Sequence, residues 1–170
     1  QIRAGRIDVL GGLGASGTRE VVLLSADGTE ARYAGTGPIR ACDTSCLRIG
    51  AMTNDEGFAP EVAGCLMADG VEVVFWYDWG HDPAAEMMAR TRAGENKIYV
   101  IRCAPVSSGD ASCIVAPTGV IAASTLPGED QISGAMVTPF LTSLKTVVPG
   151  TNVLEDRFPD DYEYLVSPEH

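Results

Sequence analysis

The polar run Asn54-Asp55-Glu56 stands between an apolar segment and a helix signal, and its residue types are the first candidates for chemistry. The adjacent carboxylates of Asp55 and Glu56 carry the groups that general acid–base catalysis uses. Asn54 contributes an amide, which forms hydrogen bonds but does not ionise to a nucleophile. Glu61 follows at the start of a predicted helix, where a negative side chain interacts favourably with the positive end of the helix dipole. We weigh a carboxylate-based hydrolase against a structural role for these acids, and favour the structural role.

Three aromatic residues, Trp76, Tyr77 and Trp79, cluster at the end of the next apolar run. Aromatic side chains line binding pockets, and they pack equally well inside a core. We take these three as candidate binding residues and leave both interpretations open.

The thiols and imidazoles give little support for a metal or cofactor. Cys42 and Cys46 have the spacing of a metal clip, but no second close pair and no nearby histidine completes four zinc ligands. Cys65 is expected to face the core from a helix, which makes it a poor substitute nucleophile. We therefore predict no metal and no cofactor. The odd total of five cysteines, without a regular framework, indicates reduced thiols and a cytoplasmic setting.

Strand and helix signals alternate along the chain. Helices are predicted over 59–69, where Pro60 suits the first turn and Gly70 ends it, and over 83–95, with Asp82 as N-cap. Turns are predicted at Asp27-Gly28 and at Pro117-Thr118-Gly119. Apolar and β-branched runs predict strands at 21–24, 29–33, 47–52, 71–77, 97–103, 112–116 and 119–123. This order predicts an α/β fold in which helices cover one face of a sheet.

Composition narrows the classes of protein. A chain of 170 residues that is 45% hydrophobic and 21% charged is typical of one globular domain. The net charge of −11, with only 12 basic residues, argues against nucleic acid and anionic membranes as partners. No apolar run reaches the ~18 residues of a spanning helix, and no signal peptide is visible. Because the chain begins at Gln1 rather than Met, we expect a processed product or a piece of a longer chain.

Six segments in the same order resemble the nitrilase, or carbon–nitrogen hydrolase, superfamily. They are the 22–33 hairpin, the 43–50 run with Asp43-Thr44 and Arg48-Ile49-Gly50, the 49–61 segment, the 89–96 helix end, the 109–119 hairpin, and Asp156-Arg157-Phe158-Pro159. The match is to the second half of a family member. It implies an α/β fold that is the two-layer half of a nitrilase-type α-β-β-α sandwich, a mixed sheet with helices on one face. We expect one partial domain over 1–170, with an extended C-terminal tail over 151–170.

The resemblance also implies a catalytic glutamate, lysine and cysteine, none of which stands at its expected place here. The glutamate belongs to the family's first half. The lysine should follow the hairpin that ends at Tyr33, but the first lysine of the chain is Lys97. The cysteine position is Asn54, with Glu56 as the neighbouring acid, and no residue is a confident catalytic candidate. Trp76, Tyr77 and Trp79 stand where the family has residues of its substrate pocket.

Three interpretations of function follow. We favour a nitrilase-like domain that binds a ligand or a partner without turnover. The alternatives are a fragment of an active amidase or nitrilase that hydrolyses non-peptide C–N bonds, and a generic α/β binding module. An isolated half would leave an apolar sheet face uncovered around 71–75 and 98–101, and such a face usually marks an interface. We therefore expect as partners the missing N-terminal half or another subunit, and a homo-oligomer of the chain.

Overall fold

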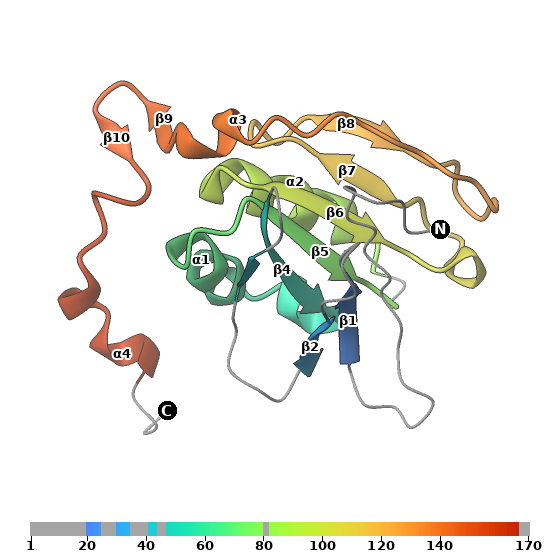
Figure 1. The fold of residues 1–170 in the computed structure, drawn as a ribbon, viewed down its shortest axis with the longest axis horizontal. Helices are drawn as coiled ribbons and strands as arrows, with labels where there is room; N and C mark the ends of the chain where they lie inside the picture. Colours follow the sequence, from blue (N-terminus) through green and yellow to red (C-terminus); the bar gives the residue numbers. More distant parts are fainter. Residues whose placement is uncertain (1–19, 25–29, 35–40, 44–46, 80–81, 167–170) are drawn as a thin grey trace.

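The computed structural model describes residues 20–24, 30–34, 41–43, 47–79 and 82–166. Its centre is a six-stranded mixed sheet in the order β3-β4-β5-β6-β7-β8 (Figure 1). Strands β4, β5 and β6 run parallel to one another, and the other neighbouring strands of the sheet pair antiparallel. The strands are β3 (Cys42–Asp43), β4 (Arg48–Thr53), β5 (Val73–Tyr77), β6 (Tyr99–Cys103), β7 (Cys113–Val115) and β8 (Ile121–Ser124). The strands predicted at 47–52, 71–77, 97–103, 112–116 and 119–123 are therefore confirmed, whereas β3 was not predicted.

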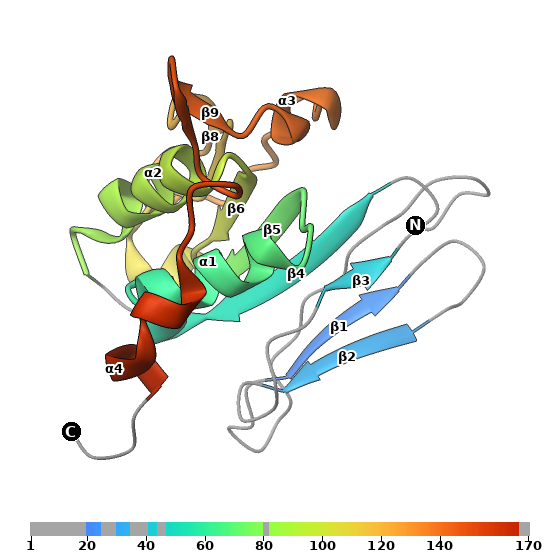
Figure 2. The same ribbon diagram turned by 90° about the vertical axis from the view of Figure 1, so that its left-hand side faces the viewer.

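Two helices, α1 (Pro60–Ala68) and α2 (Ala85–Asn96), cover one face of this sheet (Figure 2). Both were predicted, but α2 begins two residues later than expected. The reason is that Asp82 forms a separate turn: its carboxylate accepts a hydrogen bond from the Ala84 N–H, over 2.8 Å. The helix therefore starts after this turn, with Ala84 rather than Asp82 at the N-cap. At its other end, Lys145 Nζ donates to the carbonyl oxygens of Asn96 and Lys97, over 3.2 Å each.

The helix-covered face holds the main core. Alanines on α2 allow this helix to approach the sheet closely, because a methyl side chain adds little to the separation. The buried residues of this layer include Met52, Val74, Trp76, Val100 and Val115 from the strands, and Leu66, Ala89 and Ala93 from the helices. Cys65 does not join them. It is exposed, contrary to prediction, since Ala63, Leu66 and Met67 are the residues that α1 turns toward the sheet.

The opposite face of the sheet is more covered than the sequence predicts. Ile49, Ala51, Val73 and Tyr99 form a second buried cluster, against which Val137 packs. Further along the strands, Phe75, Tyr77 and Ile101 are only half-buried. The apolar face is therefore sealed at one end and partly open at the other, rather than bare.

Two smaller sheets lie outside the central one. The predicted hairpin is confirmed as β1 (Glu20–Leu24) paired antiparallel with β2 (Glu30–Ala34), while its turn lies outside the described residues. After β8 the chain returns across the sheet and reaches α4, which lies away from the sheet in Figure 1. The elements on this path are α3 (Phe140–Ser143), β9 (Thr146–Val148), β10 (Thr151–Asn152) and α4 (Glu163–Val166). No helix in the described ranges is long and apolar enough to cross a membrane.

Candidate functional site

The candidate site begins where β4 ends. Thr53 is the last strand residue and is fully buried. Asn54 then takes a left-handed backbone conformation, with φ of 43°, and opens the 3₁₀ turn Asn54–Gly57 that leads into α1. Among non-glycine residues, asparagine is one of the few that enter this conformation readily. The chain therefore makes a sharp strand-to-helix elbow at Asn54.

Two hydrogen bonds from the end of β5 fix this elbow. The backbone N–H of Trp79 donates to the side-chain Oδ1 of Asn54, over 2.9 Å. The indole Nε1 of Trp76 donates to the backbone carbonyl of Asn54, also over 2.9 Å. The carboxamide of Asn54 is thus directed at the chain that follows β5.

Glu56 closes the turn on its other side. Its Oε2 accepts hydrogen bonds from the backbone N–H of Thr53, over 2.6 Å, and from the Thr53 hydroxyl, over 2.9 Å. Thr53 and Glu56 form the capping box of this turn, which satisfies polar groups at the start of a helical turn. Asp55 beside it is exposed. The predicted pair of acids therefore divides into one residue that holds the turn and one that faces solvent.

Trp76, Tyr77 and Trp79 occupy three different environments, because consecutive strand residues point to opposite faces of a sheet. Trp76 is fully buried beneath the turn, where its ring meets Phe58 edge to face at 5.5 Å. Tyr77 is half-buried on the opposite face, where burial raises the pKa of its phenol. Trp79 lies beyond the strand and is 48% exposed. Tyr77 and Trp79 retain surface for a ligand, whereas Trp76 is a core residue.

A buried ion pair at the same strand ends was not anticipated from the sequence. Arg102 on β6 donates from Nε to Asp78 Oδ2 over 2.8 Å, and its Nη2 also bonds to Asp110, over 3.3 Å. Its guanidinium carbon lies 6.0 Å from the centre of the Trp76 ring. The signal was a single arginine inside an apolar strand, preceded by an aspartate at the end of the neighbouring strand. Opposite charges at buried positions of adjacent strands are expected to pair.

Arg92 is the second supporting residue that the sequence did not reveal. It is buried on α2, where its Nε donates to the Gly57 carbonyl over 3.1 Å and its Nη2 to the Phe58 carbonyl over 2.8 Å. A guanidinium has several donors in a fixed fork, so it can hold two backbone carbonyls at once. The elbow is therefore tied to α2 as well as to β5.

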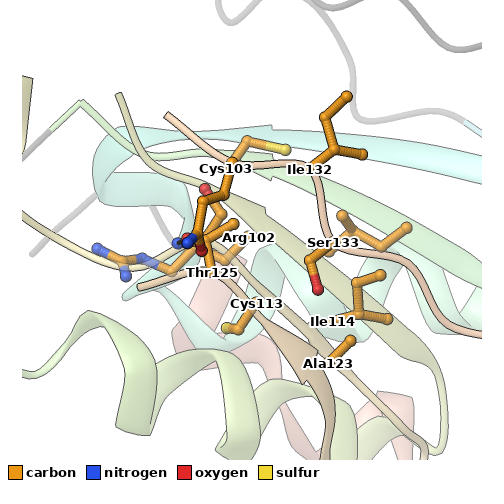
Figure 3. Close-up of a pocket in the computed structure, with 11 residues that line it drawn as sticks. Arg102, Cys103, Cys113, Ile114, Ala123, Thr125, Ile132 and Ser133 are labelled. Atoms are coloured by element: carbon orange, nitrogen blue, oxygen red, sulfur yellow. Dashed lines mark hydrogen bonds between the residues drawn. The ribbon is translucent and has the colours of Figure 1, made fainter. Parts of the chain in front are cut away.

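The structure contains a pocket, but the elbow residues do not line it. This pocket of about 270 Å³ lies over β6, β7 and β8, beneath residues 131–133 (Figure 3). Its walls include Ile101, Cys103, Ile114, Thr125 and Ile132. Among the described residues, no group of three or more His, Cys, Asp or Glu side chains is placed to hold a metal ion. Cys46 lies outside the described residues, so the Cys42–Cys46 spacing has no structural counterpart to report.

The model of the carbon–nitrogen hydrolase family matches residues 13–144. The chain belongs to this family. The match includes β4, the elbow, α1, β5 and α2, together with the hairpin of β7 and β8. No curated protein sequence matches the chain.

Solved structures share the carbon–nitrogen hydrolase fold at low sequence identity. A nitrilase-superfamily protein of branch 10 from Saccharomyces cerevisiae gives a TM-score of 0.72 at 20% identity, over 83% of this chain and 60% of that one. A carbon–nitrogen hydrolase from Helicobacter pylori G27 matches with a TM-score of 0.75 at 19% identity. The match covers 95% of this chain and 70% of that one. An amidase from Nesterenkonia sp. matches with a TM-score of 0.69 at 16% identity. The match covers 86% of this chain and 60% of that one. The predicted α/β fold, a mixed sheet with helices on one face that matches nitrilase-type structures, is thus confirmed, and the chain spans about 60% of the first of these relatives.

Proposed function

We propose that this carbon–nitrogen hydrolase domain binds a ligand or partner without catalysing turnover. The observation that carries the proposal is Asn54 at the elbow after β4, the place that the resemblance assigns to the nucleophilic cysteine. Its carboxamide oxygen already accepts the Trp79 N–H, and an amide has no ionisable group with which to attack a C–N substrate.

The three thiols whose surroundings the structure describes, Cys65, Cys103 and Cys113, do not offer a replacement. Burial raises the pKa of Cys103, and raises that of Cys113 to about 11, so both remain protonated and weakly nucleophilic at neutral pH. Cys65 lies on the exposed side of α1. These unpaired cysteines also support a reducing, cytoplasmic setting.

Tyr77 and Trp79 are the residues that we assign to ligand contact. Both flank the elbow and both retain exposed surface. Neither needs to move for a ligand to reach it, whereas Trp76 would have to leave the core.

The direct test is incubation of the chain with simple amides, nitriles and carbamoyl compounds, followed by intact-mass analysis and an ammonia assay. We expect no covalent adduct and no ammonia. An adduct on the unmodified chain, or ammonia release that Asn54→Ala abolishes, would instead support the alternative of an active amidase or nitrilase fragment.

The informative variant is Asn54→Cys, made in a Cys65→Ser background that removes the exposed thiol. Acrylamide is a suitable probe, because one structure of the Nesterenkonia amidase records its Michael addition at the active-site cysteine. We expect slow labelling at position 54, since the carboxylates of Asp55 and Glu56 disfavour a neighbouring thiolate. We expect no ammonia release, because the lysine and glutamate of the family's mechanism are still missing. Asn54→Ser in the same background is the matched control and should not be labelled.

A further inference from the structure

Lys145, between α3 and β9, binds the end of α2. Its Nζ donates to the carbonyl oxygens of Asn96 and Lys97, over 3.2 Å each. Carbonyl groups in the last turn of a helix have no partner within the helix, and the negative end of the helix dipole favours a cation there. The Lys145 ammonium therefore caps α2 from a segment that lies 49 positions after Asn96 in the sequence.

The Lys145 ammonium is held partly out of water. Its side chain is half-buried, and this burial lowers the pKa of Lys145, an effect that the carboxylate of Glu72 partly opposes. A cation that loses part of its hydration needs acceptors in fixed places. The two carbonyls at the end of α2 supply these acceptors, and a side chain without a donor at position 145 would lose both hydrogen bonds.

The same segment has a second anchor in Val153. The Val153 N–H donates to the Lys145 carbonyl, over 3.0 Å, and its side chain packs against the helix-covered core. Strands β9 and β10 lie between these two residues and pair with each other. Residues 145–153, which we call the clasp, therefore form a closed hairpin that is attached to α2 at one point and to the core at another (Figure 1).

Hydrogen bonds connect the clasp to the elbow through the end of α2. Asn96, the last residue of this helix, donates from Nδ2 to the Arg92 carbonyl, over 3.0 Å. Arg92 in turn donates to the carbonyls of Gly57 and Phe58, over 3.1 and 2.8 Å. Arg92 and Asn96 are each only 5% exposed. Since a buried polar group without a partner is costly, a shift of the helix end has to be accommodated at the elbow.

We propose that Lys145 is a latch through which the clasp controls the rigidity of the elbow. With the ammonium in place, the end of α2 is fixed, and Arg92 holds the turn at Gly57. Without it, the clasp leaves α2, the last turn of the helix loosens, and the elbow opens more often. The elbow accepts the Trp79 N–H at Asn54, so the latch determines how well ordered the ligand-contact residue Trp79 is.

This inference rests on the proposed function for the role of the elbow as a ligand site, and it assigns the regulation of that site to the clasp. Its test measures the opening of the backbone and uses no substrate. Turnover at the elbow would overturn the proposed function and leave the latch result unchanged. Failure of the latch would leave the absence of turnover unchanged.

Hydrogen exchange of single amides, followed by NMR, is the test. Two amides report on the two ends of the hydrogen-bond series: that of Val153, bonded to Lys145, and that of Trp79, bonded to Asn54. Lys145→Met keeps the apolar stem and removes the charge. In this variant we expect exchange at least about tenfold faster at Val153 and about threefold faster at Trp79, with the amides of β5 unchanged.

Lys97→Met is the matched control. It removes the same charge beside the bonded carbonyls, but the Lys97 side chain makes none of the hydrogen bonds of the series. Both reporter amides should exchange in this variant as in the native chain. Lys145→Arg keeps a positive charge and several donors, so it should restore most of the protection that Lys145→Met removes.

Asn96→Ala tests the route, because it removes the side chain that joins the helix end to Arg92. When Lys145→Met is added to this variant, exchange at Val153 should still become faster. Exchange at Trp79 should not increase further. An equal further increase at Trp79 would show that Asn96 does not carry the coupling, and would overturn the proposed route.

An unchanged Trp79 amide in Lys145→Met, with a fast Val153 amide, would overturn the proposal, because the effect of the clasp would then be local. Equal acceleration at both reporters and in β5 would also overturn it, since Lys145 would then support the whole fold. So would a response of Lys97→Met equal to that of Lys145→Met, which would indicate an effect of net charge rather than of the contact with α2.

Discussion

At the scale of single residues, the ion pair of Asp78 and Arg102 connects the elbow to the neighbouring strand ends. Both side chains are almost completely inaccessible to solvent, and Arg102 Nη2 lies 2.7 Å from Asp78 Oδ2. Two further acceptors, the Ala111 carbonyl and the Asp110 carboxylate, satisfy the guanidinium. A charged pair at this depth is tolerated because each charge compensates the other.

We predict that Arg102→Ala lowers the free energy of unfolding by about 3–5 kcal/mol, since it removes the buried cation that compensates Asp78. The double variant Asp78→Ala, Arg102→Ala should lose less free energy of unfolding than the two single variants lose in total. Urea denaturation measures all three. Arg157→Ala, in the exposed C-terminal segment, is the control and should change little. Additive losses in the double variant would show that the two charges do not depend on each other.

Cys113 should behave as a protonated thiol well into the alkaline range. Burial raises its pKa from about 9 to about 11, an effect that the nearby Arg102 only partly opposes. The folded state therefore holds the proton more tightly than the unfolded state. The resulting stability is complete below about pH 9 and is lost as the pH rises toward about 11.

Alkylation with iodoacetamide near pH 8, followed by peptide mass mapping, tests this prediction. We expect rapid modification of the exposed Cys65 and very slow modification of Cys113, because only the thiolate reacts. Urea midpoints of the native chain should also fall between about pH 9 and about pH 11 more steeply than those of Cys113→Ala. Similar alkylation rates for the two cysteines would contradict the burial of Cys113.

At the scale of elements, the 3₁₀ turn Asn54–Gly57 is held from both β5 and α2. The ring of Trp76 from β5 lies directly beneath the turn, and Arg92 from α2 binds its last carbonyl. Gly57 permits this close approach, since a Cβ at this position would lie only 2.0 Å from the Trp76 ring. The geometry of the elbow therefore depends on glycine at position 57, because a side chain there would overlap the Trp76 ring.

We predict that Gly57→Ala destabilises the protein by about 1–3 kcal/mol or more, because the added methyl has to displace a buried indole. Gly64→Ala on α1 is the matched control. Its nearest neighbour to an added Cβ is 3.9 Å away, so the change should stabilise the helix by about 0.5–1 kcal/mol. Thermal and urea unfolding of the two variants should shift in opposite directions. Shifts of equal sign and size would show that the turn can move away from Trp76.

At the scale of the whole molecule, the two faces of the sheet differ in completeness. The helix-covered face is closed by α1 and α2, with a continuous buried cluster. The opposite face is closed around Tyr99 and Val73 but has a hollow beneath residues 131–133. The division of the chain into one domain with a C-terminal tail stays a prediction.

The sequence by itself determined most of the elements from β1 to β8 and their order, but not β3 or the elements after β8. Apolar runs, Pro60 and the turn glycines are local signals, and they act through backbone preferences that need no distant partner. For that reason β4, α1, β5, β6 and the β7–β8 turn lie close to their predicted places. The chemistry available at position 54 was equally fixed, since an amide cannot ionise in any environment.

Only the tertiary structure decided what surrounds each side chain. Cys65 is exposed and Trp76 is buried in the core. Asp78 pairs with Arg102, which lies 24 positions later in the sequence. The bond from Trp79 to Asn54 likewise joins residues 25 positions apart. Such contacts depend on which elements pack together, and a local pattern carries no information about the partner across the sheet. Thus the residue type at the elbow could be read from the sequence, whereas the contacts that support the elbow, and the hollow under residues 131–133, depend on the fold.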